Sequence, residues 1–180
     1  MSAWTTSTYG NTVAFGGTNS YGSVAESASL EITSQLTVSF WVNPSSNTNT
    51  DPRVISKLYD WDVKLNGSNR YPQLSAGGQY AMLNYSLPVN TWHHVVFTFS
   101  TGVVTGYVDG AQVPLAANTF TGGGPLPNNA YGLYLGTYDS SLANAYKGYM
   151  NEVRLYSRAL SATDVAALYS GLQPITKKRR

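Results

Sequence analysis

Apolar and polar residues alternate in short runs along most of the chain. Between residues 36 and 42, every second position holds Leu, Val or Phe, so one face of an extended segment there is apolar. Clusters rich in Gly, Asn or Pro, such as the one at 43–52, separate the runs and are typical of loops. A period of two predicts antiparallel strands. We expect strands at 12–15, 36–42, 53–57, 61–65, 79–85, 92–99, 103–108, 131–136 and 146–156.

The segment 92–110 contains the clearest of these patterns. Two apolar strands are joined by a short turn, and Asp109 and Gly110 then form a pair that favours a tight turn with a positive φ at the glycine. His93 and His94 are adjacent, so in a strand they lie on opposite faces and cannot chelate one ion together. We therefore interpret both histidines as structural.

One helix is predicted, at Ser161–Ser170. Ser161 can cap its first turn, and Asp164 completes a capping-box variant whose carboxylate also lies at the positive end of the helix dipole. Leu160 before the cap can pack on Val165, as in a hydrophobic staple. We expect the helix to lie on the strands through Val165, Leu168 and Tyr169.

The composition narrows the ligands that the surface suits. Charged residues make up 11% of the chain, against about 25% in average globular domains. Aromatic residues make up 13%, and 14 residues are tyrosines. A surface of Ser, Thr, Asn, Gly and Tyr suits uncharged polar ligands such as sugars, or a neutral protein interface. The lack of cysteine excludes thiolate chemistry and Cys-ligated zinc.

The net charge of +2 arises from the C-terminal tail, where Lys177, Lys178, Arg179 and Arg180 supply four of the 11 basic residues. Without them, seven basic and nine acidic residues leave a net charge of −2. We therefore expect no nucleic-acid binding by the folded body, since phosphate contacts need a basic face. No apolar segment is long enough to span a membrane. No signal peptide is recognised, so we expect synthesis in the cytoplasm. Display of the protein on a virion or a cell surface is compatible with this expectation.

Five segments together resemble a known family. They are Val13–Gly17, Leu36–Pro44, Trp92–Val95, Tyr107–Gly110 and Gly148–Ser161. In their order and spacing the chain resembles the laminin-G-like jelly roll of the concanavalin A-like lectin and glucanase superfamily. The resemblance implies an all-β fold, an antiparallel two-sheet β-sandwich with paired terminal strands and one short C-terminal helix. We expect a single domain at 1–174 and a basic tail at 175–180.

Aromatic residues in or beside predicted loops define the candidate ligand site. Sugar rings stack on aromatic faces, while nearby Asn or Asp side chains orient the hydroxyls. The alternative is that Tyr is simply a common sandwich residue with a half-buried ring and a wet hydroxyl. The candidate ligand-binding residues are Tyr59, Asp60, Trp61, Asp62, Tyr71, Tyr80, Tyr85, Tyr138 and Tyr146.

Asp60 and Asp62 also raise the question of catalysis. In an extended strand the two carboxylates point to one face, about 6.5–7 Å apart, and glycosidases use carboxylates about 5–9.5 Å apart. The glucanases of the superfamily carry a Glu-x-Asp-x-x-Glu strand, and no such triplet exists among the three glutamates of this chain. We therefore expect no catalytic residue and no enzymatic activity, with a glycoside hydrolase as the least favoured hypothesis.

Calcium is the one cofactor that the resemblance allows. It needs several converging oxygens, and no loop concentrates acidic residues, so the ligands of a metal site cannot be assigned. The family usually carries Asp-Glu where this chain has Asn151-Glu152, which puts a metal or salt-link role of that acid in doubt. Oxygens could come from Asp51, Asp60, Asp62, Asp109 and Asp139.

Two functions fit these features best. The first is a non-catalytic binding or adhesion module that recognises a glycan or a protein surface. The second is a structural virion component, such as a phage capsid decoration or fibre-associated protein, whose partner would be a capsid or an oligomer. The two are compatible, because a decoration protein can also bind host glycans. Neither the ligand nor the oligomeric state follows from the sequence.

Overall fold

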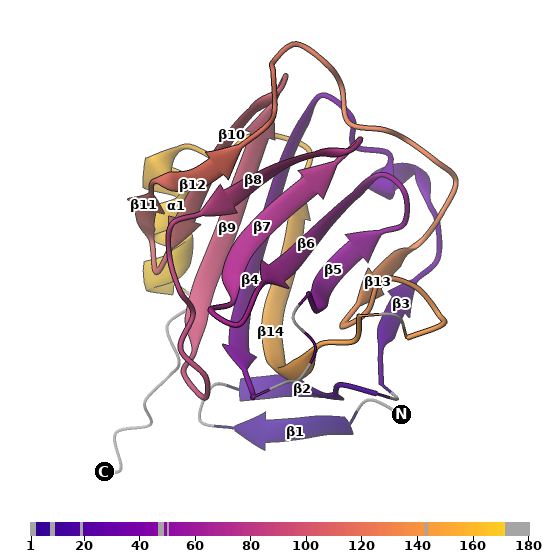
Figure 1. Ribbon diagram of the computed structural model, residues 1–180, viewed down its shortest axis with the longest axis vertical. Helices are drawn as coiled ribbons and strands as arrows, with labels where there is room; N and C mark the ends of the chain where they lie inside the picture. Colours follow the sequence, from indigo (N-terminus) through magenta and orange to yellow (C-terminus); the bar gives the residue numbers. More distant parts are fainter. Residues whose placement is uncertain are drawn as a thin grey trace.

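The computed structural model describes residues 3–7, 10–18, 20–46, 49, 51–142 and 144–171. These residues form two antiparallel sheets packed face to face, with one helix on the outer side of the first sheet (Figure 1). The predicted all-β sandwich is confirmed. The predicted basic tail at 175–180 lies outside the described residues.

The first sheet has the strand order β1-β2-β14-β4-β9-β10-β11 within the described part of the chain. Its strands are β1 (Ala3–Ser7), β2 (Gly10–Gly16), β4 (Gln35–Pro44), β9 (His93–Ser100), β10 (Val103–Val108), β11 (Ala111–Val113) and β14 (Lys147–Tyr156). Strand β14 pairs with both β2 and β4, so strands from the two ends of the chain are neighbours, as the family resemblance implied.

The second sheet lies in front in Figure 1 and has the order β12-β8-β7-β6-β5-β13-β3 over the described residues. Its strands are β3 (Gly22–Val24), β5 (Arg53–Lys57), β6 (Trp61–Asn66), β7 (Tyr71–Ala76), β8 (Gln79–Leu83), β12 (Leu115–Asn118) and β13 (Leu133–Leu135). A 3-10 turn, η1 (Ala28–Leu30), and one helix, α1 (Ala162–Gly171), complete the elements of the described chain.

Strand β4 shows how the alternating pattern builds the core. Its apolar positions from Leu36 to Val42 are at most 1% exposed and belong to the cluster between the sheets. The intervening Ser39 and Trp41 are buried as well, because α1 covers the other face of this sheet. Tyr169 of α1 stacks on Trp41 with 5.7 Å between the ring centroids. A strand covered on both faces is thus the centre of the first sheet.

Helix α1 begins as the sequence predicts. The Asp164 N–H donates to Ser161 Oγ (3.2 Å), and the Ser161 N–H donates to Asp164 Oδ2 (3.0 Å). This reciprocal pair is the expected capping box. Leu160 and Val165 are both buried in one small cluster with Val96 and Tyr107 of the first sheet. The hydrophobic staple and the packing face are therefore confirmed.

The Asp-Gly turn joins β10 to β11 and also holds the histidine pair. Asp109 (φ 52°) and Gly110 (φ 80°) both adopt the left-handed conformation that a two-residue hairpin turn needs. The Asp109 carboxylate accepts a hydrogen bond from His93 Nδ1 (2.8 Å) and another from the His94 N–H (2.9 Å). His94 Nε2 lies 2.9 Å from Ser39 Oγ in the interior. Both histidines are structural, as predicted.

All nine expected strands are present, but five further strands (β1, β3, β7, β11 and β12) were not predicted. Strand β7 is the important omission, because it lies between β6 and β8. Its Pro72 is typical of loops. Here Pro72 lies opposite Leu65, whose own N–H bonds to Pro52 O (3.0 Å) on the far side of β6. The proline therefore replaces no donor in the β6–β7 ladder.

Candidate functional site

A hollow of about 290 Å³ opens at one end of the second sheet. Three segments form it: the turn between β5 and β6 with the start of β6, the turn between β7 and β8, and the loop after β13. Hereafter "the hollow" means the space lined by Tyr59, Asp60, Trp61, Asp62, Ser75, Ala76, Gly77, Gly78 and Tyr138.

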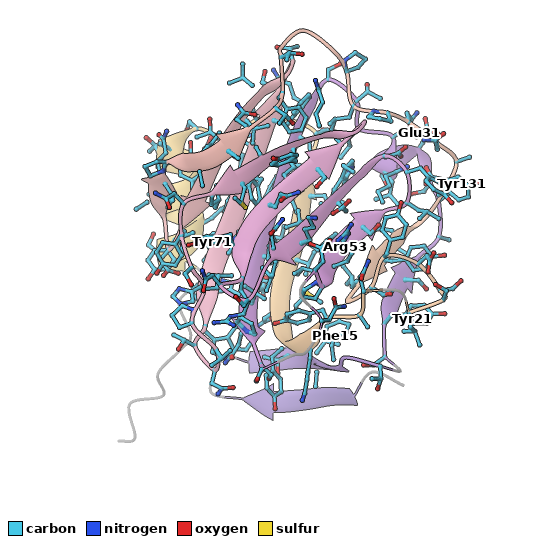
Figure 2. The ribbon with its side chains drawn as sticks, in the orientation of Figure 1. Phe15, Tyr21, Glu31, Arg53, Tyr71 and Tyr131 are labelled. Atoms are coloured by element: carbon cyan, nitrogen blue, oxygen red, sulfur yellow. The ribbon has the colours of Figure 1, made fainter. Side chains whose placement is uncertain are left out.

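Three tyrosines, Tyr59, Tyr131 and Tyr138, form a tyrosine rim at the hollow. Tyr59 is 61% exposed and Tyr131 is 46% exposed. Tyr59 lies edge-on to Tyr131, with 5.3 Å between ring centroids, and edge-on to Tyr138 at 6.4 Å. Figure 2 shows Tyr131 at the margin of the sheet and Arg53 nearer its middle. Edge-to-face contacts of this kind hold exposed rings in a fixed arrangement.

The backbone of Tyr59 is strained. Its φ is 65°, in the left-handed region that bulky side chains rarely adopt. Strained residues of this kind cost about 1–3 kcal/mol and cluster at ligand-binding and active sites. A glycine would fit this turn at lower cost. Seven other non-glycine residues of the described chain also have a positive φ, so it is the exposure of Tyr59 together with its backbone conformation that makes it a candidate for ligand contact.

Beside the rim, Arg53 and Asp62 form an ion pair on the outer face of the sheet. Arg53 Nε lies 3.1 Å from Asp62 Oδ1, and the guanidinium lies over the Tyr138 ring at 5.6 Å from its centroid. Burial raises the pKa of Asp62 to about 6, an effect that the neighbouring Arg53 and Lys64 charges only partly oppose. Asp62 is therefore a carboxyl group that changes its charge near pH 6.

The charges around the hollow balance one another. Asp51 pairs with Lys64 (2.8 Å) and with Arg53 (3.0 Å), and Arg53 also pairs with Asp62. Burial raises the pKa of Asp51, but hydrogen bonds from Lys64 and Arg53 outweigh it and the net shift is downward. Two cations thus face two carboxylates, and the group offers no unpaired charge to a ligand.

A second ion pair lies beneath the rim. Lys57 Nζ donates to Asp60 Oδ2 (2.6 Å) and to the backbone oxygen of Asn129 (2.9 Å), and it lies 3.3 Å from Glu26 Oε2. Asp60 Oδ1 accepts from both the N–H and the side-chain amide of Asn129 (2.8 and 2.7 Å). The network joins the turn that carries Tyr59 to the loop that carries Tyr131.

The structure brings five of the nine predicted residues to the hollow, namely Tyr59, Asp60, Trp61, Asp62 and Tyr138. Asp60 is 2% exposed and its carboxylate is engaged by Lys57 and Asn129, so the two predicted carboxylates have separate partners. Tyr80 lies on the same outer face, two strands from Asp62 through Ser75.

The other three predicted residues lie elsewhere. Tyr71 pairs with Asn66 at the opposite end of the β6–β7 hairpin, five residues or about 16 Å along the strands from the hollow. Tyr85 packs edge-on to His93, against the main core. Tyr146 was expected near a loop with an accessible ring, and this is wrong. It is 1% exposed, packs on Phe15, and donates from its hydroxyl to the Tyr149 backbone oxygen (3.2 Å).

Sequence reasoning missed Arg53, Tyr131 and the Gly77-Gly78 turn. Arg53 and Tyr131 fall in segments that the sequence assigned to strands, and their part in the site depends on contacts far along the chain. The two glycines have φ values of 56° and 78°. Because glycines have no side chain, the turn between β7 and β8 places no side chain over the hollow at Gly77 and Gly78. The Gly-Gly pair between Ala76 and Gln79 was a usable turn signal.

The described residues contain no group of three His, Cys, Asp or Glu side chains that could hold a metal ion. The five aspartates considered for calcium do not converge. Besides the pairs given above, Asp109 binds the histidines, and Asp139 accepts from the Ser141 hydroxyl and N–H. At Asn151-Glu152, β14 has a bulge, and Glu152 pairs with Arg154 (2.6 Å) at the surface. In the described chain, no helix has the length and apolarity to cross a membrane.

Comparison with known proteins identifies the family. Residues 15–166 match the model of the concanavalin A-like lectin/glucanases superfamily. A segment of the zebrafish (Danio rerio) adhesion G-protein coupled receptor V1 is 25% identical in an alignment of 168 residues that covers 83% of this chain and 3% of the receptor. The chain therefore corresponds to a small part of that relative.

Two solved structures share the fold. The binding domain of Paraclostridial Mosquitocidal Protein 1 has a TM-score of 0.74 and 17% identity, over 94% of this chain and 45% of that one. Domain 4 of AbnA, a GH43 extracellular arabinanase from Geobacillus stearothermophilus, was solved in complex with arabinotriose. It has a TM-score of 0.67 and 21% identity, over 94% of this chain and 81% of that one. With its family model matched over most of its length, the chain belongs to the concanavalin A-like lectin/glucanases superfamily.

Proposed function

We propose that the chain is a non-catalytic module that binds a neutral saccharide in the hollow. The observation that carries this proposal is the strained Tyr59, whose exposed ring lies with Tyr131 and Tyr138 beside the Arg53–Asp62 pair. The rim offers apolar ring surface, and the pair offers polar atoms a short distance away. This combination is what saccharide recognition requires.

Polar atoms on the floor of the hollow support the same ligand class. Asp62 lies on the outer face of β6 and contributes carboxylate oxygens, whereas Trp61 is 3% exposed and its ring belongs to the core between the sheets. Ser75, directly opposite Asp62 on β7, adds a hydroxyl to the lining. The hollow thus offers both donors and acceptors.

The balanced charges favour an uncharged ligand. Arg53 and Lys64 already face Asp51 and Asp62, so an acidic sugar would have to compete with carboxylates of the protein for the same cations. Breaking such pairs leaves a partly buried carboxylate without its partner, which is costly. We therefore expect neutral oligosaccharides to bind and sialylated or uronate-containing ones not to bind.

The placement of the carboxylates supports a non-catalytic role. Asp60 accepts hydrogen bonds from Lys57 and Asn129, which leaves Asp62 as the carboxylate accessible from the hollow. Glycoside hydrolysis needs two carboxyl groups that flank one bond. The arabinotriose complex of the AbnA domain supports saccharide binding by this fold and makes arabinotriose the first probe.

The test compares three variants on a panel of neutral and acidic oligosaccharides that includes arabinotriose. Tyr59→Gly removes the ring and relieves the positive φ, so the free energy of unfolding should change by less than about 1 kcal/mol. Its saccharide affinity should nevertheless fall by about five- to thirtyfold, since a stacked aromatic ring contributes on the order of 1–2 kcal/mol. Tyr131→Ala should weaken binding in the same direction.

Tyr149→Ala is the matched control, because Tyr149 is a similarly exposed tyrosine (41%) on β14 of the other sheet. Its affinity should equal that of the wild type. Binding that survives Tyr59→Gly unchanged would place the site elsewhere. A panel on which no saccharide binds to the wild type would contradict the proposed function itself.

A further inference from the structure

The ion pair beneath the tyrosine rim has the composition of a cation site. Three oxygens from three separate segments surround Lys57 Nζ: Asp60 Oδ2 at 2.6 Å, the Asn129 backbone oxygen at 2.9 Å and Glu26 Oε2 at 3.3 Å. Carboxylates with a backbone carbonyl are the ligands that Ca²⁺ takes in proteins. The centre of this oxygen cluster is occupied by the ammonium group of the chain itself.

The cluster is deeply buried. Lys57 and Asp60 are each 2% exposed, and both carboxylate oxygens of Glu26 are inaccessible to solvent. Apart from the 3.3 Å ion pair with Lys57, the Glu26 oxygens have no hydrogen-bond partner among the described residues. Two carboxylates around one ammonium also leave a formal charge of −1. A buried acidic group of this kind depends on the cation at its centre.

The cluster also determines the position of the rim. Asp60 directly follows Tyr59, and Asn129 lies two residues before Tyr131, whose N–H bonds to the Asn129 backbone oxygen (2.8 Å). Lys57 and Asn129 are 72 residues apart in the chain. Their hydrogen bonds, together with those between Asp60 and Asn129, join the turn of Tyr59 to the loop of Tyr131.

We infer that Lys57 is an internal cation that takes the place of a divalent metal in this oxygen cluster, so that the module folds and holds its tyrosine rim without calcium. Calcium does not fit among these oxygens, because Lys57 Nζ already occupies the space between them. Lys57, Asp60 and Glu26 are positioning residues for the rim. This inference does not depend on the identity of the ligand that the hollow binds.

Two substitutions of Lys57 separate the roles of charge and space. Lys57→Ala removes the ammonium group and opens room for an ion among the oxygens. Lys57→Met removes the charge but keeps a side chain of similar length in that room. The experiment measures the thermal unfolding midpoint (Tm) of wild type and both variants, in millimolar CaCl₂ and in excess chelator.

The wild-type Tm should be the same in calcium and in chelator. In chelator both variants should lose about 10 °C, since each leaves buried carboxylates without a cation. Calcium at a hundredfold excess over its Kd should restore about 5–10 °C to Lys57→Ala and nothing to Lys57→Met. Adding Glu26→Gln to Lys57→Ala should abolish the calcium response, which assigns the ion to this cluster.

Tyrosine-sensitised terbium luminescence gives a second readout, because Tyr59 and Tyr131 flank the cluster. Lys57→Ala should show it at micromolar terbium, and the wild type should not. If Lys57→Ala is unfolded in chelator, circular dichroism should show that calcium restores its strands. A wild-type Tm that depends on calcium would overturn the inference. The inference would also be overturned if calcium raised the Tm of Lys57→Ala, or restored its strands, no more than it does for Lys57→Met.

Discussion

Replacement of Asp62 by asparagine should change how stability depends on pH. Burial raises the pKa of Asp62 from 3.8 in the unfolded chain to about 6 in the fold. A carboxyl group with a raised folded-state pKa contributes stability below its unfolded pKa, and this contribution is lost as pH rises through the folded pKa. The asparagine side chain of the variant stays neutral at every pH. The stability of the variant relative to the wild type should therefore increase from pH 4 to pH 7.

The size of the effect follows from the shift. A rise of about two pKa units corresponds to about 3 kcal/mol between the two protonation states, of which about 2 kcal/mol falls between pH 4.5 and 7. The ion pair with Arg53 works against burial and is already contained in this net shift. His94 acts in the opposite direction over the same range, because burial lowers its pKa to about 4. The free energy of unfolding of the wild type therefore changes little with pH over this range. The difference in free energy of unfolding between Asp62→Asn and the wild type isolates the effect of Asp62.

The assay is urea denaturation of both proteins at half-unit steps from pH 4.5 to 7.5, with the slope m checked for constancy. Ser75→Ala, a neutral change directly opposite Asp62 on β7, is the control and should shift stability equally at every pH. A difference between Asp62→Asn and wild type that stays constant with pH would show that Asp62 titrates normally. Burial of this carboxyl group at the hollow would then be refuted.

Three further predictions concern the scaffold. Ser161→Ala should lower the free energy of unfolding by about 1 kcal/mol through loss of the capping box, while Ser161→Thr should be near wild type in the same denaturation assay. Gly132→Ala should cost about 1–3 kcal/mol, because the new Cβ would meet the Val24 backbone oxygen at 2.3 Å; unchanged stability would show that the β3–β13 edge yields freely. His94→Gln should gain up to about 3 kcal/mol of stability relative to the wild type on acidification from pH 6.5 towards 4, because the buried His94 resists protonation, and calorimetry of both proteins at both pH values measures this difference.

Most of the fold could be predicted because it depends on local pattern. The alternation at 36–42 indicated which residues of β4 face the second sheet, and Ser161 with Asp164 marked the start of α1. Strand β7 could not be found in this way. Its Pro72 is a loop signal, and the proline is tolerated because it stands where the β6–β7 ladder needs no N–H: the Leu65 N–H opposite it points away from β7 and bonds to Pro52 O. That position depends on the register of two strands, which local sequence does not show.

The site was harder to predict because it depends on contacts between distant segments. Tyr59, Trp61 and Asp62 could be selected from their composition, and they do lie at one hollow. Tyr146 is of the same residue type and also lies next to a loop, yet its ring fills the core beside Phe15. Nothing local distinguishes the two tyrosines. The difference is the hydrogen bond from Lys57 Nζ to the Asn129 backbone oxygen, which holds the turn of Tyr59 at the surface. This contact joins segments far apart in the chain, so the alternation of apolar and polar residues does not predict it.

A structural role on a virion, the second function that fits the sequence, stays a prediction. The same holds for a protein partner in place of a glycan. Either would use exposed surface, and the tyrosine rim is available to a protein as well as to a sugar.

Saccharide binding in the hollow can be located residue by residue. The measurement is a titration of the ¹⁵N-labelled protein, followed by amide chemical shifts, with the saccharide that binds best in the panel. We predict that the large shift changes are confined to residues 57–62, 75–78 and 129–138, and that they disappear in Tyr59→Gly. Changes centred on β14, on α1 or on the histidine pair of β9 would contradict a saccharide site in the hollow.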